Sequence, residues 1–277
     1  MRIPPFLYVI YMWFNGQQLS SNSLDRGLQF GDGHFTTLVI RHRRIEFWPR
    51  HWQRLQDASK RLGMALPQQN ELEHVLQEIA AAHSHCVVKI MITRGSSQRG
   101  YAPEPNAAIN WYVTVNPLAA WSMVGVQVEQ AALQVAQQPA LAGLKTLNRL
   151  EQVLLSQERQ QRQVDDLIVC DTSGQVVEAL SSNLFWFDGH KWRTPRLDQA
   201  GINGILRQEI CAHVLPSAVA SRAVFAEFAT AEQAFLCNTV LGPRPITHIN
   251  QRPLAKTVLP EVVYTWYSNV LSKSSAP

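Results

Sequence analysis

A single lysine near the middle of the chain is the strongest candidate for a reacting residue. Lys145 lies just after a glycine, in a chain that contains few lysines. A lysine amine becomes a nucleophile for an aldehyde only where burial or a neighbouring cation lowers its pKa. The alternative from this segment alone is an exposed lysine before a surface helix. The residues that follow predict a helix to about residue 163, with an apolar face made by Leu147, Leu150, Leu154 and Leu155.

Glu178 is the second candidate. It follows Val176 and Val177 in an apolar run that is interrupted only by the polar residues 181–183. An unpaired carboxylate is costly to bury. The sequence therefore predicts that Glu178 has a partner inside the protein.

Three segments have the composition of anion-binding sites. Residues 201–207 lead straight into a predicted helix, whose free amides and dipole favour a phosphate. The polar loop 94–101 contains two arginines and is either an anion-binding loop or an ordinary hairpin connection. Arg54 lies beside the apolar stripe of a predicted helix over 50–64, for which Gly63 is the stop signal, so its side chain points either inward or into water.

The remaining pattern predicts a mixed α/β protein in two parts. Three glycines within residues 27–33 indicate a sharp turn or a close approach of a ligand, without the spacing of a P-loop or a dinucleotide fingerprint. A connection at 117–123 divides the chain into domains 1–120 and 121–277. We expect further helices at 71–83, up to about 215 and at 259–271, and strands at 87–93, 107–115, 124–128, 167–171, 176–178, 184–187 and 235–239.

Composition narrows the choice of partners. The 277 residues carry a formal charge of +4, which fits an anionic small molecule as well as nucleic acid. The only dense basic cluster, residues 41–44, lies between apolar runs and predicts a solvated hairpin turn, so we expect no nucleic acid. Residues 3–14 are apolar but too few to cross a bilayer, and they predict an edge strand before the Asn15-Gly16 turn. Met12 is a hypothetical alternative start.

The cysteines and histidines do not suggest a metal site. Cys86, Cys170, Cys211 and Cys237 are widely separated, with no C-x-x-C pair and no matching histidine spacing. We interpret them as reduced, mostly buried thiols in a cytoplasmic protein.

Taken in order, these motifs resemble the fold-type IV pyridoxal-phosphate enzymes, which include branched-chain and D-amino-acid aminotransferases and aminodeoxychorismate lyases. The resemblance covers about residues 14–245. Within this family the chain looks most like the aminodeoxychorismate lyases, because Phe35-Thr36 and Asn203-Gly204 replace the Tyr-Glu and Thr-Arg pairs of the transaminases. The motifs that carry the resemblance are Phe30-Gly31-Asp32-Gly33, His51-x-x-Arg54-Leu55, Arg94 to Tyr101, Lys145-x-x-Asn148, Glu178 with Ser181-Ser182-Asn183, Gly201-Ile202-Asn203-Gly204 and Asn238-Thr239.

The resemblance implies a two-domain fold-type IV architecture (α+β / α/β), a homodimer, and a role for each motif. Lys145 would bind pyridoxal 5'-phosphate covalently and later move a proton, and Glu178 would keep the pyridine nitrogen protonated. The phosphate would be held by Arg54, the amides of Ile202 and Asn203, and the Thr239 hydroxyl. The substrate would be contacted by Thr36, Ser181, Arg99 and Tyr101, the last two in the neighbouring subunit's site.

The implied reaction converts 4-amino-4-deoxychorismate to 4-aminobenzoate and pyruvate, a step toward folate that needs no metal or nucleotide. Thr36 and Thr37 are candidates for protonating the departing pyruvate enol. Two alternatives remain at this point: an aminotransferase for D-amino or branched-chain amino acids on the same scaffold, and a non-catalytic protein that binds pyridoxal phosphate.

Overall fold

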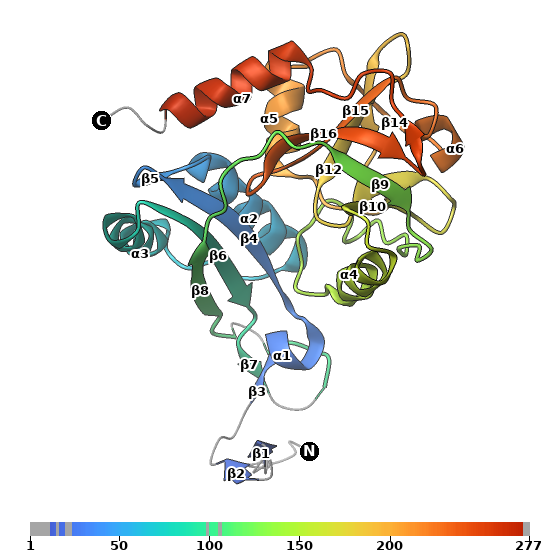
Figure 1. Cartoon of the computed structure of the whole chain (residues 1–277). Helices are drawn as coiled ribbons and strands as arrows, with labels where there is room; N and C mark the ends of the chain where they lie inside the picture. Colours follow the sequence, from blue (N-terminus) through green and yellow to red (C-terminus); the bar gives the residue numbers. More distant parts are fainter. Residues whose placement is uncertain (1–11, 15–16, 20–23, 98–99, 105–106, 274–277) are drawn as a thin grey trace.

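The computed structural model describes residues 12–14, 17–19, 24–97, 100–104 and 107–273 (Figure 1). Its N-terminal part is built on an antiparallel sheet of four strands in the order β5-β4-β6-β8. Two helices, α2 (Trp48–Leu62) and α3 (Gln69–Ala82), pack their apolar residues against it. The strands are β4 (Gly33–Arg41), β5 (Arg44–Ile45), β6 (His85–Thr93) and β8 (Asn110–Pro117).

The alternation of β6 determines what each face of this sheet carries. Val88, Ile90 and Ile92 are fully buried in the core shared with α2 and α3, so Lys89 lies on the opposite face. In the register of the β4–β6 pair, Lys89 is opposite Thr37, and Ile90 is opposite Thr36. Thr37 and Lys89 therefore share one face of the sheet.

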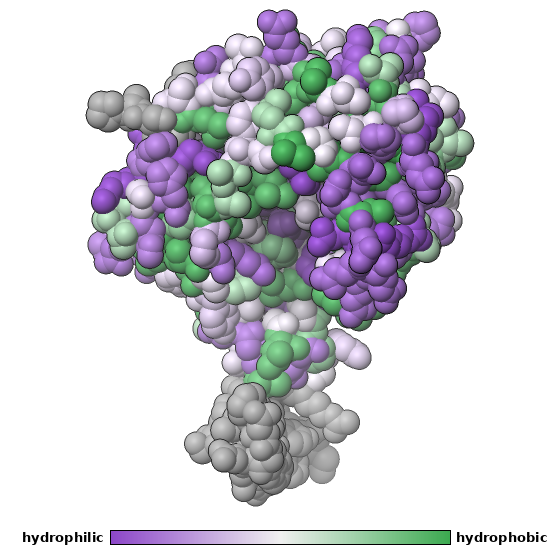
Figure 2. All heavy atoms as spheres, viewed as in Figure 1, coloured by the Kyte–Doolittle hydropathy of each residue, from purple (hydrophilic) through white to green (hydrophobic). Residues whose placement is uncertain are grey.

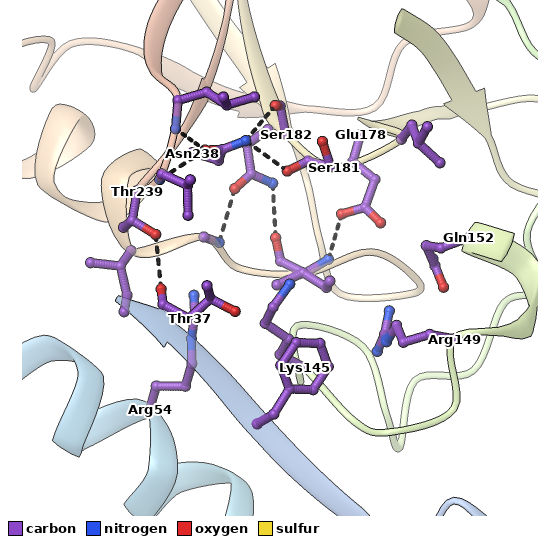
Figure 3. A pocket seen from close by; sticks show the side chains of 18 residues that line it. Thr37, Arg54, Lys145, Arg149, Gln152, Glu178, Ser181, Ser182, Asn238 and Thr239 are labelled. Carbon is purple, nitrogen blue, oxygen red and sulfur yellow. Dashed lines mark hydrogen bonds between the residues drawn. The ribbon is translucent and has the colours of Figure 1, made fainter. Parts of the chain in front are cut away.

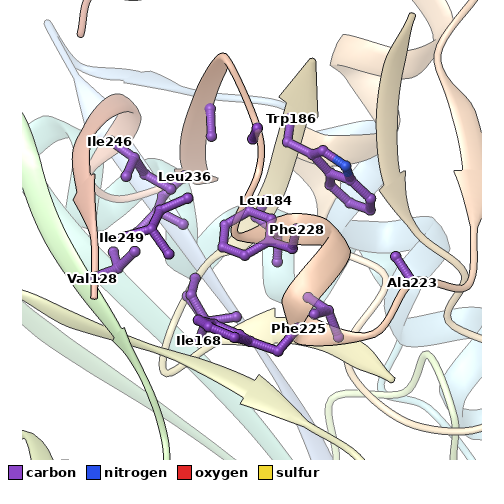
Figure 4. Packing of buried hydrophobic residues seen from close by; sticks show 14 of the residues in the cluster. Val128, Ile168, Leu184, Trp186, Ala223, Phe225, Phe228, Leu236, Ile246 and Ile249 are labelled. Atoms are coloured by element: carbon purple, nitrogen blue, oxygen red, sulfur yellow. The ribbon is translucent and has the colours of Figure 1, made fainter. Parts of the chain in front are cut away.

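The C-terminal part contains a larger sheet of nine strands in the order β11-β10-β9-β16-β15-β12-β13-β14, with β17 paired to β16. A core of aliphatic and aromatic residues lies against it, with Trp186 and Phe228 packed edge to face at 5.8 Å (Figure 4). The strands are β9 (Val126–Gln130), β10 (Asp166–Cys170), β11 (Val176–Ala179), β12 (Asn183–Phe187), β13 (Trp192–Pro195), β14 (Val219–Ser221), β15 (Gln233–Asn238), β16 (Gly242–Ile249) and β17 (Arg252–Pro253).

Helices and short strand pairs complete the described structure. Helix α7 crosses one end of the molecule, and α4 lies beside β10 of the C-terminal sheet (Figure 1). The strand expected over residues 3–14 is described only at its end, as β1, which pairs with β2, and the rest of that expectation lies outside the described residues. The elements are β1 (Met12–Phe14), β2 (Gln17–Leu19), β3 (Leu24–Asp25), α1 (Arg26–Phe30), β7 (Ser96–Ser97), α4 (Leu150–Arg162), α5 (Ile205–His213), α6 (Phe225–Phe228) and α7 (Glu261–Lys273).

The two large sheets have separate hydrophobic cores. The division at residue 120 stays a prediction. The basic cluster is a hairpin turn, as expected, but Arg41 is buried in an ion pair with Glu46 at 2.9 Å. All four cysteines are free, and three of them are buried. Over the described ranges, no helix is long and apolar enough to cross a membrane, and no three potential metal ligands cluster.

The predicted helix after the lysine is wrong at its start. Helix α4 begins only at Leu150, and both Leu150 and Leu154 are exposed, so the expected leucine face is not the buried one. The residues before it run extended beside the start of β4: Lys145 O accepts from Phe35 N–H (2.9 Å), and Leu147 N–H donates to Gly33 O (3.0 Å). This pairing joins residues more than 100 positions apart, which helical periodicity does not reveal.

Two glycines of this region should differ in how much stability is lost when each is replaced by alanine. Gly63, which ends α2 as predicted, and Gly95 both have positive φ, but only Gly95 has no room for a Cβ, which would overlap Ala108 O. We expect Gly63→Ala to lower the free energy of unfolding by about 1 kcal/mol and Gly95→Ala by about 2–5 kcal/mol. Urea denaturation of both variants measures the difference, and equal losses would contradict the steric account.

Candidate active site

A cavity of about 470 Å³ lies among residues of β4, α2, α4, β11, β12 and the loop after β15. The extended segment that contains Lys145, called the lysine segment below, also lines it. On the face shown in Figure 2, the surface is hollowed between the N-terminal sheet and α4, and hydrophobic residues lie in the hollow. The cavity brings together Lys145, Glu178, Arg54, Ser181 and Thr239, five of the residues predicted from the sequence. These residues are far apart in the sequence, and their side chains lie around one space (Figure 3).

Lys145 is the central amine of this cavity. Its side chain lies with Arg54 on one side and Glu178 and Arg149 on the other (Figure 3), and Nζ is 4.7 Å from the centre of the Phe35 ring. Burial lowers the pKa of Lys145 to about 8, and the cations of Arg54, Arg149 and Lys89 act in the same direction, against Glu178. At neutral pH about a tenth of such amines are uncharged, far more than for an exposed lysine. The surface-lysine alternative is therefore wrong.

Arg149 forms hydrogen bonds to the backbone and to one side chain of the lysine segment. Its Nε donates to Thr146 O (2.9 Å), and its Nη2 donates to Thr146 Oγ1 (3.1 Å) and Leu144 O (3.4 Å). The guanidinium therefore bonds to the carbonyls on both sides of Lys145 while its charge faces the amine. Arg149 was not predicted from the sequence, because the helical spacing of the leucines after Lys145 places it in a helix rather than beside the amine.

Replacing Arg149 should raise the pKa of Lys145. In Arg149→Gln a nearby positive charge is lost, so the protonated amine is less disfavoured and its pKa moves upward from about 8. The pH dependence of Lys145 acetylation in cofactor-free protein, followed by mass spectrometry, measures this shift.

Arg61 provides the matched control, because it also fastens this segment, through Ala142 O at 2.9 Å and Ala140 O at 2.9 Å. It is not among the charges that shift the pKa of Lys145. An equal shift in Arg61→Gln would attribute the effect to a loosened segment rather than to charge.

Glu178 is buried, as predicted, and its partner is identified in part. Its Oε2 accepts from Ile202 N–H at 2.9 Å. Burial raises the pKa of Glu178, while the Ile202 amide and the cations Arg149 and Lys145 oppose the rise. The carboxylate lines the cavity, so a cationic or N–H group of a ligand can become a second partner.

The predicted phosphate residues are only partly in position. Arg54 lines the cavity and donates from Nη2 to Asn203 O at 2.9 Å, and the Thr239 hydroxyl donates to Thr37 O at 3.1 Å. The amides assigned to the phosphate are already bonded, Ile202 N–H to Glu178 and Asn203 N–H to Gly143 O at 3.1 Å. Ile205, the first residue of α5, lines the cavity instead, and the first amides of a helix have no partner within it.

The predicted substrate residues divide into three groups. Ser181 lines the cavity. Thr36 does not, because it is fully buried on the other face of β4, where its hydroxyl is 2.6 Å from His51 Nδ1. Tyr101 is 83% exposed and contacts Phe30 rather than the cavity, and Arg99 lies outside the described residues.

Strand alternation separates Thr37 from Thr36 and also indicates Lys89, which was not predicted from the sequence. Thr37 lines the cavity, and Lys89, its cross-strand neighbour, places Nζ 4.5 Å from the centre of the Phe35 ring. Lys89 alternates along β6 with three core residues, which indicates that its side chain points to the opposite face of the sheet. Lys89 thus places a cation beside Phe35, which lines the cavity.

Comparison with known proteins identifies a family and several relatives of this chain. A family model, amino-transferase class IV, matches residues 33–249. An aminodeoxychorismate lyase from Vibrio harveyi is 28% identical over 86% of this chain and 91% of its own length. The crystal structure of 4-amino-4-deoxychorismate lyase from Pseudomonas aeruginosa has a TM-score of 0.82 and 30% identity, covering 94% of this chain and 98% of that one.

A hypothetical aminotransferase from Mycobacterium tuberculosis, solved in a PLP-bound form, shares the fold, with a TM-score of 0.73 and 18% identity over 90% of this chain and 91% of that one. The fold is therefore that of the fold-type IV enzymes, as expected from the sequence. The family model covers most of the chain, and so the chain belongs to the aminotransferase class IV family.

Proposed function

We propose that this protein is a pyridoxal-phosphate-dependent lyase that converts 4-amino-4-deoxychorismate to 4-aminobenzoate and pyruvate. The observation that carries the proposal is the convergence of Lys145, Glu178 and Arg54 on one cavity in a chain 30% identical to the Pseudomonas aeruginosa lyase. The family supplies the cofactor chemistry, and the two lyase relatives suggest the reaction.

The cavity fits pyridoxal phosphate. Glu178 is a buried carboxylate with one described hydrogen bond, so a protonated pyridine nitrogen would supply the partner that its burial calls for. At the other end, Arg54, Thr239 and the start of α5 offer a cation, a hydroxyl and amides for a phosphate. Lys145 lies between these ends, where its amine can bond to the aldehyde (Figure 3).

The residues of the chain divide the work of the reaction. Lys145 would hold the cofactor through its amine, and the amine would also take the proton from the amine-bearing carbon of the substrate. Bound pyridoxal phosphate supplies an electron sink for the resulting negative charge. Glu178 would keep the pyridine nitrogen of the cofactor protonated. Arg149 holds the backbone around Lys145 in place, and Lys89 offers a cation for a substrate carboxylate. The ether bond then breaks as the ring becomes aromatic.

Thr37 is the hydroxyl that lies on the cavity side of β4, so we assign it, rather than Thr36, to protonate the departing pyruvate enol. We expect Thr37→Val to lower kcat by about 10²-fold, with pyruvate release as the measurement. Thr36→Val is the matched control, because it changes the same atoms on the buried face beside His51. A larger loss of kcat in the thermally stable Thr36 variant would contradict the assignment.

Product analysis tests the proposed function against an aminotransferase. The purified protein, supplied with pyridoxal phosphate, should release pyruvate from aminodeoxychorismate without an amino acceptor. A strict requirement for a 2-oxo acid would instead indicate transamination. A bound cofactor with neither activity would indicate a non-catalytic binding protein.

The proposed enzyme acts in the cytoplasm as a homodimer. Helix α4 carries an exposed apolar stripe, defined here as Leu150, Val153 and Leu154, which a second copy of the chain would cover. Tyr101 is too exposed to serve its own cavity, which supports its assignment to the neighbouring subunit's site. Sedimentation of wild type and Leu154→Arg would test the dimer, since a charge in this stripe should give monomers. The free cysteines support a reducing compartment.

A further inference from the structure

A second cavity, of about 370 Å³, adjoins the active-site cavity. The two share four wall residues, and Lys145 lines only the first. A ligand that reacts at Lys145 can therefore extend past this shared wall into the second cavity. The shared residues are Gln152, Leu180, Ser181 and Leu241.

Two arginines from separate elements line the second cavity, Arg159 of α4 and Arg244 of β16. The Nε atom of each is buried and has no hydrogen-bond partner among the described residues. The only described hydrogen bond of Arg159 runs from Nη1 to Asp165 O at 3.3 Å. The Nε side of its guanidinium is therefore available for a carboxylate, which arginine binds through two parallel N–H groups.

Two carboxylates, Asp165 and Asp166, line this cavity beside the two arginines, and Asp166 forms an ion pair with Arg244. Asp166 Oδ2 lies 3.4 Å from Arg244 Nη2, and Asp166 Oδ1 accepts from two backbone amides. Asp165 is exposed, and its Oδ2 accepts from Gln127 N–H at 2.8 Å. Among the described residues, no carboxylate lies within ion-pair distance of Arg159, although its charge acts on Asp166, so the guanidinium can take a carboxylate at closer range.

The polar face of α4 that lines the second cavity is distinct from its apolar stripe. Gln152, Ser156 and Arg159 recur at i, i+4 and i+7, which places them on one side of the helix. The residues of the stripe fall on the opposite side by the same spacing. A second copy bound to the stripe would leave the second cavity open to the active site.

We propose that Arg159 and Arg244 form a carboxylate subsite that binds the ring carboxylate of the substrate. The identity of the ligand rests on the proposed function. In aminodeoxychorismate this carboxylate is para to the amine, so it is the part of the ring farthest from Lys145. The subsite therefore selects a substrate with a negative charge at that end, and Arg159 is the residue that sets the selectivity.

The test compares two ligands that differ only in charge. The dissociation constants of 4-aminobenzoate and 4-aminobenzamide are measured by calorimetry on the protein loaded with pyridoxal phosphate. The wild type should bind the carboxylate about tenfold more tightly than the amide, and Arg159→Gln and Arg244→Gln should each lose that preference. In the lyase assay the same variants should raise KM about tenfold with kcat nearly unchanged.

Arg162→Gln is the matched control, because Arg162 lies on the same helix but pairs with Glu158 at 2.7 Å and does not line the cavity. A preference that survives in both subsite variants, or that disappears equally in Arg162→Gln, would overturn the proposal. The absence of a preference in the wild type would also overturn it. A preference that is lost as expected in a protein without lyase activity would keep the subsite and reject the proposed function.

Discussion

Replacing Lys145 by alanine should abolish pyruvate release from aminodeoxychorismate, lowering kcat by at least about 10⁴-fold. In the proposed mechanism this amine both bonds to the cofactor and moves the proton, and its lowered pKa would make both steps accessible near neutral pH. The same variant should lose the visible absorption band at roughly 410–430 nm that a lysine-bound cofactor gives. Absorption of the purified protein and a coupled pyruvate assay measure the two effects.

Lys89 provides the control for this experiment. It is the other lysine beside the Phe35 ring, with Nζ 4.5 Å from the ring centre, so Lys89→Gln removes a similar charge from the same surroundings. We expect this variant to keep the visible band and to lose activity mainly through KM. If the band persists in Lys145→Ala, or disappears in Lys89→Gln, the reacting amine has been assigned incorrectly.

Replacing Glu178 by glutamine should lower kcat by about 10²–10³-fold, comparable to the loss of one preorganised electrostatic contact. Glutamine keeps the shape and can still accept a hydrogen bond from Ile202, so we expect the fold and cofactor binding to survive. The variant lacks the negative charge that would hold a proton on the ring nitrogen. The measurement is kcat for pyruvate release at saturating pyridoxal phosphate.

The matched control is Glu151→Gln. Glu151 is a nearby carboxylate that raises the pKa of Glu178 through its charge, but it does not line the active-site cavity and its Oε1 accepts from Ala136 N–H at 3.0 Å. Its kcat should change by no more than about twofold. If Glu178→Gln retains wild-type kcat, the ring nitrogen does not depend on this carboxylate.

The resemblance in sequence was sufficient to place the chain in its family and to name three residues that line one cavity. Lys145, Glu178 and Arg54 belong to short motifs, and each was singled out before any contact was known. Short-range patterns also predicted the end of a helix correctly. Gly63 ends α2 because the residue there has a positive φ, which glycine tolerates. The strands of β6, β10 and β12 followed from their apolar residues alone.

Errors arose where one sequence pattern fits two structures. The leucines after Lys145 have helical spacing, but the first of them belong to an extended segment that pairs with β4. Thr36 and Thr37 are neighbours of the same type, and the pleat of a strand sends one toward His51 and the other into the cavity. The residue chosen from the motif was the buried one.

The sequence by itself determined the family and selected Lys145 and Glu178 as candidates, because these depend on residue type within short motifs. Only the tertiary structure decided which groups surround them: Arg149 and Lys89 beside the amine, Glu178 on the Ile202 amide, and a second cavity with two arginines. These contacts join residues that are far apart along the chain. Their energies depend on burial and distance, which exist only once the two sheets have packed together.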